Sequence, residues 1–115
     1  MEEIEAVIRS FGGHQYRICY KDLCWVIYVE KDYQPNPPKM EAVVFEASRI
    51  AKRTSPRSMW RSVARAVEDL WDSGDLDALF AYQHCWVRYR PKPQEFVELV
   101  AWRIWKGEEI GRAHV

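Results

Sequence analysis

The stretch RIAKRTSPRSMWRSVARAVEDLW, residues 49–71, decides the fold because it contains a turn between two helical patterns. Ser55 can accept a hydrogen bond from the backbone amides of the next turn, and Pro56 suits the first position of a helix, where no N–H is needed. These two residues predict a helix over about residues 56–73, which stops at Gly74.

Upstream of this turn, apolar side chains at helical spacing predict another helix over about residues 39–53. The side chains expected to point inward are Val43, Val44, Ala47, Ile50 and Ala51. A helix, a short polar turn and a second helix with a basic beginning predict a helix-turn-helix at about residues 41–73.

On a helical wheel of about 100° per residue, the helix after the turn has two different faces. One face is apolar and predicts burial. The other collects three arginines spaced four residues apart, without a carboxylate beside them. Arginine suits DNA recognition because its planar fork can bind a guanine edge or a phosphate through two hydrogen bonds. The residues expected to read bases are Arg57, Ser58, Arg61 and Arg65, while Trp60, at the edge of the apolar face, is left open between core packing and an apolar groove contact.

The charges of the chain are segregated although they sum to zero. Residues 49–65 carry six basic and no acidic side chains, whereas residues 66–87 carry five acidic side chains and no lysine or arginine. A local basic field of this kind attracts a polyanion. The alternative to a polyanion-binding surface is an ordinary solvent-exposed face that is basic by chance.

The remaining chain predicts one domain over residues 1–108 and a loosely held tail over residues 109–115. Further helices are expected at residues 2–11, before a Gly-Gly stop, at residues 76–82, after a cap by Asp75, and at residues 94–106. Residues 16–33 are ambiguous, because their aromatic and β-branched side chains favour a hairpin whereas Asp22 could cap a helix.

Several function classes find no support in the sequence. No apolar run approaches the roughly 20 residues of a membrane span, and the acidic first residues do not resemble a secretory signal, so a cytoplasmic protein is expected. The cysteines are expected to be reduced thiols, because Cys19, Cys24, His84 and Cys85 lack the spacing of a zinc site. No pattern of catalytic residues stands out, and we expect neither an enzyme nor a cofactor or metal site.

Residues 43–80, VVFEASRIAKRTSPRSMWRSVARAVEDLWDSGDLDALF, resemble the helix-turn-helix region of the C-terminal effector domains of the stage zero sporulation protein A family. KPQEFVELVAWRI, from Lys92, is similar to the last helix of that family, and the likeness extends from about Ile4 to Glu108. It implies an all-α fold of about six helices, of the winged-helix-like, response-regulator effector type, with helix at Tyr20–Asp32. It also implies that two copies bind repeated DNA sites.

The sequence departs from this family in two ways. The receiver domain of the family has no counterpart in this chain, so we expect no aspartate-phosphorylation switch. In the recognition helix, Trp60 replaces a glutamate of the family, Ala64 replaces an arginine and Arg65 replaces a histidine. The same DNA target is therefore not expected.

These observations predict a sequence-specific, double-stranded-DNA-binding regulator of transcription related to sporulation effectors, in a bacterial cytoplasm and on the nucleoid when bound. The alternative is a protein-interaction module on the same fold that does not bind DNA. A homodimer is expected through the last helix, with Phe96, Trp102 and Trp105. The residues expected to hold phosphates are Arg49, Lys52, Arg53, Thr54, Ser55, Arg88, Arg90 and Lys92.

Overall fold

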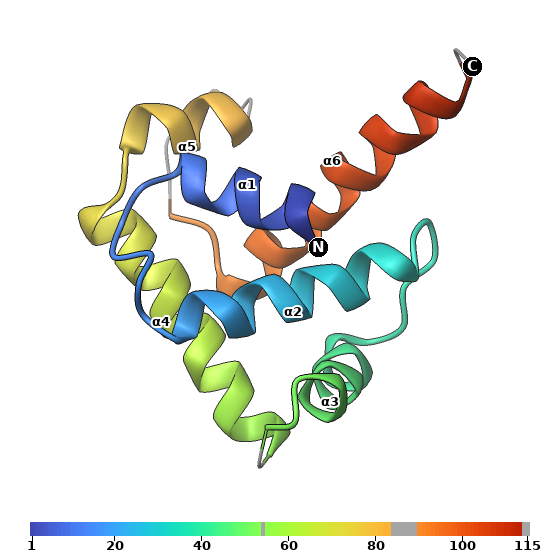
Figure 1. Ribbon diagram of the computed structural model, residues 1–115, viewed down its shortest axis with the longest axis horizontal. Coiled ribbons are helices and arrows are strands. Elements are labelled where there is room, and N and C mark those ends of the chain that lie inside the picture. Colours follow the sequence, from blue (N-terminus) through green and yellow to red (C-terminus); the bar gives the residue numbers. More distant parts are fainter. Residues whose placement is uncertain (54, 84–89, 114–115) are drawn as a thin grey trace.

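The computed structural model describes residues 1–53, 55–83 and 90–113, with side chains described as far as residue 110. These residues form six helices and no strand (Figure 1). The helices are α1 (Glu2–Ser10), α2 (Cys19–Asp32), α3 (Met40–Ile50), α4 (Pro56–Ser73), α5 (Leu76–Gln83) and α6 (Pro93–Ala113). The all-α prediction is confirmed, whereas the described residues contain no β-hairpin that would form a wing.

Helix α2 lies at the centre of the molecule and contacts α1, α3, α4 and α6 (Figure 1). Its residues are buried on most sides, and a helix that is apolar nearly all round is one that other elements enclose. Tertiary burial therefore decides the ambiguous segment 16–33 in favour of helix. The capping role expected of Asp22 is wrong, because α2 begins at Cys19 without a side-chain cap and Asp22 is a buried residue of its first turn.

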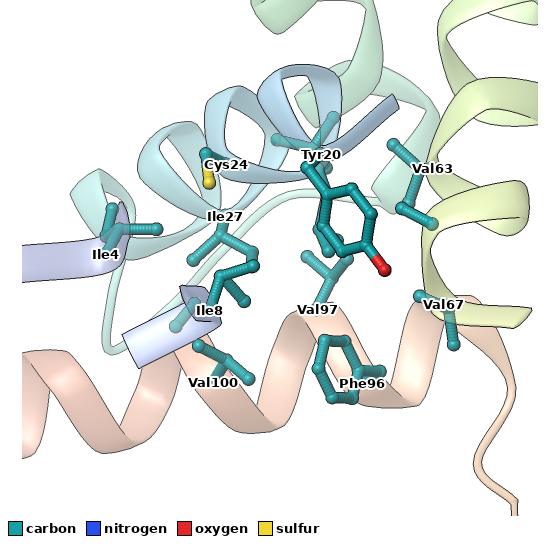
Figure 2. Packing of buried hydrophobic residues seen from close by; sticks show 14 of the residues in the cluster. Ile4, Ile8, Tyr20, Cys24, Ile27, Val63, Val67, Phe96, Val97 and Val100 are labelled. Carbon is teal, nitrogen blue, oxygen red and sulfur yellow. The ribbon is translucent and has the colours of Figure 1, made fainter. Parts of the chain in front are cut away.

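The hydrophobic core surrounds α2 (Figure 2). In this view Tyr20 lies between α4 and α6, beside Val63 and Val97, while Ile27 faces Ile8 of α1. Each fully buried aliphatic or aromatic side chain of this kind contributes about 1.5–3 kcal/mol. The core thus joins α1, α4 and α6 to one central helix.

Helices α3 and α4 pack against each other on the same side of α2 (Figure 1). Helix α3 ends at Ile50, three residues before the predicted end, and Lys52 adopts a left-handed backbone conformation with φ 57°. The prediction that Ile50 points inward is wrong, because its side chain is 44% exposed in the last turn of α3.

The ends of α1 and α4 lie side by side. The backbone N–H of Asp75 donates to the carbonyl oxygen of Phe11 at 2.8 Å, and Gly12 and Gly74 form an isolated antiparallel bridge. As predicted, Asp75 then caps α5, because its Oδ1 accepts a hydrogen bond from the backbone N–H of Ala78 at 3.1 Å.

Helix α6 continues to Ala113, so the predicted end of the last helix at residue 106 is wrong, while the loosely held tail at residues 109–115 stays a prediction. Gly107 does not interrupt the helix, and the ammonium group of Lys31 pairs with the carboxylate of Glu108 at 2.9 Å. The last turns extend beyond the other helices (Figure 1). Among the described residues, no helix combines the length and the apolar character that crossing a bilayer requires.

Candidate nucleic-acid interface

The beginning of α4 is fixed by its cap. The hydroxyl oxygen of Ser55 accepts a hydrogen bond from the backbone N–H of Ser58 at 3.1 Å, and Pro56 occupies the first turn, as the sequence predicts. Pro56 has no N–H and the Ser58 N–H is used by the cap, so what the helix start offers an anion is mainly the partial positive charge of the helix dipole. The first turn of α4 is therefore a suitable place for phosphate.

Arg57, Arg61 and Arg65 are all exposed on α4, and we call them the arginine ridge. Their spacing of four residues places them one above the other along the helix, on the side away from the buried Met59 and Val63. Within the described part of the chain, no carboxylate lies at ion-pair distance from any of the three. The ridge thus presents three guanidinium groups to solvent.

Trp60 does not lie on the arginine ridge. It is partly buried, packs against the core and lines a hollow of about 430 Å³ between α3, α4 and α6. Met40 and Val44 of α3 line the same hollow, and so does Arg57 of α4. Of the two roles left open for Trp60, packing between helices is the one that this position favours.

Of the eight residues expected to hold phosphates, Ser55 caps α4 and Arg53 pairs with Asp22, while the other six divide into three groups. Arg49, Lys52 and Lys92 are exposed, and no described carboxylate pairs with them. Arg90 pairs with Asp72, and about half of each side chain is exposed. Thr54 and Arg88 lie outside the described residues.

Arg53 has a different environment from the one expected. Its guanidinium Nη2 lies 3.3 Å from Oδ2 of Asp22, whose side chain is only 3% exposed. A buried carboxylate is costly without a cation, so this pair stabilises the position of the turn against α2. Arg53 therefore has a structural role at the turn, and its expected phosphate contact stays a prediction.

The predicted dimer surface also needs correction. Phe96 is 3% exposed, and its ring packs edge-on against that of Phe11 with centroids 6.0 Å apart, so it cannot meet a second copy. Trp102 is 48% exposed and Trp105 is partly buried. Of the three residues expected at the dimer surface, only Trp102 and Trp105 on α6 are accessible to a second copy.

Sequence reasoning missed a polar cluster around Asp69, near the end of α4. The carboxylate accepts hydrogen bonds from the backbone N–H of His14 at 2.9 Å and from the hydroxyl of Tyr20, and it pairs with Arg17 at 3.1 Å. The His14 Nδ1 lies 2.7 Å from Oδ1. The available signal was the position of Asp69 at the edge of the buried arc of α4.

The opposing effects on Asp69 can be separated. Burial on its own would raise the pKa of the Asp69 carboxyl, but the hydrogen bonds from Tyr20 and His14 outweigh it and lower the pKa to about 2. The cluster therefore holds an ionised carboxylate that joins the loop between α1 and α2 to α4.

The thiols described in the structure are buried. Burial raises the pKa of the Cys24 thiol to about 12 and also raises the pKa of Cys19. Because the thiolate is the reactive form, neither thiol is set up as a nucleophile or a metal ligand. His84 and Cys85, the other two residues weighed for zinc, lie outside the described residues.

No group of three metal-binding side chains occurs among the residues that the structure describes. Comparisons with protein-family models, with curated proteins and with solved structures find no match for this chain.

Proposed function

We propose that this protein binds double-stranded DNA through a helix-turn-helix in which α3 supports α4 and α4 enters the major groove. The observation that carries the proposal is the exposed arginine ridge, whose three guanidinium groups have no carboxylate partner among the described residues. Like charges one turn apart repel each other, so an anion bound along the ridge relieves a local cost.

Base and phosphate contacts have separate roles in this proposal. Arg61, in the middle of the ridge, reads a base edge, because a guanidinium can bind guanine through two hydrogen bonds. Lys52 and Arg49, near the turn, hold phosphates and set the orientation of α4 without selecting a sequence. Thr54 and Arg88 are also proposed to contact phosphates.

The biological role follows from the resemblance of residues 43–80 to sporulation effector domains. It supports a regulator of transcription that acts in a bacterial cytoplasm on repeated DNA sites, as two copies. The changed residues around Arg61 imply a target sequence of its own.

Selection of bound fragments from a random duplex pool, followed by fluorescence anisotropy on the selected site, tests the proposal. Arg61→Ala should lose about 1–3 kcal/mol of binding free energy on the selected site and should make the protein less selective for that sequence. Lys52→Ala should weaken binding to all duplexes alike and reduce the slope of log binding constant against log salt concentration by about 1.

Lys106→Gln is the matched control, because it removes an exposed positive charge from α6. It should bind like the parent protein. If the parent protein is not retained on heparin or random DNA at low salt, or if both α3–α4 variants bind like Lys106→Gln, the proposal is wrong. The first outcome favours the protein-interaction module instead.

A further inference from the structure

A second hollow, of about 510 Å³, lies between the end of α2, the following loop and the first half of α6. Its lining includes the carboxyl groups of Glu30, Glu95 and Glu98 and the apolar side chains of Leu99 and Trp102. No lysine or arginine lines it among the described residues. This acidic hollow is distinct from the arginine ridge, and a ligand bound in it would be independent of DNA binding.

Glu30 is the unusual member of the acidic hollow. Its side chain is 1% exposed, and no described residue donates a hydrogen bond to its buried Oε2. Burial raises the pKa of the Glu30 carboxyl to about 7, and the nearby Glu98 carboxylate adds to this rise. Because an unpaired buried acid destabilises a fold, its presence beside a surface hollow points to a ligand rather than to packing.

Trp102 adds a second chemical feature. Its indole is 48% exposed on α6 and lines the hollow together with Leu99, on the same helix as Glu98. A guanidinium group is planar, so it can stack on an indole face while its edge donates paired hydrogen bonds to carboxylates. A lysine ammonium group can also approach an indole face, but it lacks the planar fork that stacks on the ring while donating paired hydrogen bonds to carboxylates.

We propose that the acidic hollow binds an arginine side chain presented by a partner protein, with the guanidinium between Glu30 and Glu98 and stacked on Trp102. Charge complementarity selects the occupant, since carboxyl groups supply all of the charge in the described lining. The half-exposed indole lies at the surface, where a side chain carried on another protein can reach it.

Binding should depend on pH because the Glu30 carboxyl must be ionised to pair with arginine. Glu98 and Glu95 on α6 are the other titratable groups in the lining, and α3 and α4 contribute none among the described residues. Lys31, next to Glu30, is already paired with Glu108. With the Glu30 pKa at about 7, affinity should rise by about tenfold from pH 6 to pH 8.

The test uses the full chain and the capped peptide Gly-Arg-Gly, with matched peptides in which citrulline or lysine replaces arginine. Binding is followed through the indole N–H resonance of Trp102 in ¹H–¹⁵N NMR spectra, identified with Trp102→Phe. The arginine peptide should shift this resonance, and Glu30→Gln and Glu98→Gln should each weaken binding by about tenfold. Glu68→Gln, which removes an exposed charge from α4, should leave binding unchanged.

Citrulline keeps the shape of arginine without its charge, so an equal effect of the citrulline peptide would overturn the proposal. An equal effect of the lysine peptide or of magnesium chloride would overturn the assignment to guanidinium. Undiminished affinity in both glutamine variants, with folding checked by circular dichroism, would show that the carboxyl groups do not hold the ligand.

Discussion

Asp69 shows how one buried carboxylate can organise a loop. Residues of the α1–α2 loop and of α2 converge on it, and its ionised form is the one they stabilise. The folded state holds the pKa of Asp69 at about 2, below its ordinary value of 3.8. Stability from this cluster is therefore present above about pH 4 and is lost as the pH falls through 2.

Tyr20→Phe should destabilise the protein by about 1.5–3 kcal/mol at pH 7, because it removes a hydrogen bond to a charged, buried acceptor. Urea unfolding measures the loss. Tyr16→Phe removes the same group from a side chain that is 83% exposed and should change nothing. Equal stability of the two variants would show that the Tyr20 hydroxyl does not stabilise the fold.

The pairing of Arg53 with Asp22 could not be predicted from the sequence. The two residues are far apart along the chain, and only the packing of α2 against α3 and α4 brings them together. The charge pattern identified Arg53 as basic but not its partner. The same reason explains why Glu30 and Asp69 were missed, since burial of a single acid leaves no pattern in its neighbours.

At the scale of the element, α4 is the helix whose ends are best predicted from neighbouring residues. Its cap at Ser55, its first-turn proline and its end before Gly74 all match the prediction, because each depends on residues within one turn. The residue pattern alone leaves α2 undecided between helix and hairpin, because the outcome depends on the elements that enclose it, whereas the family resemblance implies the helix that is found.

Ser55→Ala tests the local cap. It should lower the free energy of unfolding by about 1 kcal/mol, since the backbone N–H of Ser58 loses its acceptor. Urea unfolding compares this variant with Ser73→Ala, at the exposed end of the same helix, where the change should be near zero. A loss confined to Ser73→Ala would contradict the capping role.

The whole molecule combines two acids whose pKa values shift in opposite directions. The folded state raises the pKa of Glu30 from 4.5 to about 7 through burial, so it favours the protonated form. As the pH rises, Glu30 ionises at a lower pH in the unfolded chain than in the folded protein. The unfolded state is therefore stabilised relative to the folded state, and the free energy of unfolding falls as the pH rises from 4.5 through 7. Asp69 contributes its full stabilisation above about pH 4. Together the two acids therefore make the folded state most stable in a narrow, acidic pH range.

We expect the free energy of unfolding to be highest near pH 4–5 and to fall by up to roughly 3 kcal/mol towards pH 8. Urea unfolding across this range, with and without Glu30→Gln, checks the profile. The variant should flatten the decline, whereas Glu68→Gln should keep it. A profile that rises from pH 5 to pH 8 in the parent protein would rule out the role given to Glu30.

How far the candidate site can be predicted from the sequence also depends on scale. The arginine ridge was predictable because its spacing and the periodicity of the apolar face belong to one helix. The surroundings of the residues expected to hold phosphates were only partly predictable, since Arg90 and Arg53 have partners on other elements.

Gly13 sets a limit on how this sequence can drift during evolution. Its φ of +74° disfavours other residues, and a Cβ there would overlap the Tyr20 hydroxyl and lie 3.1 Å from the Asp69 carboxylate. By contrast, a Cβ at Gly107 would meet nothing within 4 Å. A lineage descended from this chain can replace the second glycine freely, but it can replace the first only by rebuilding the Asp69 cluster in the same step.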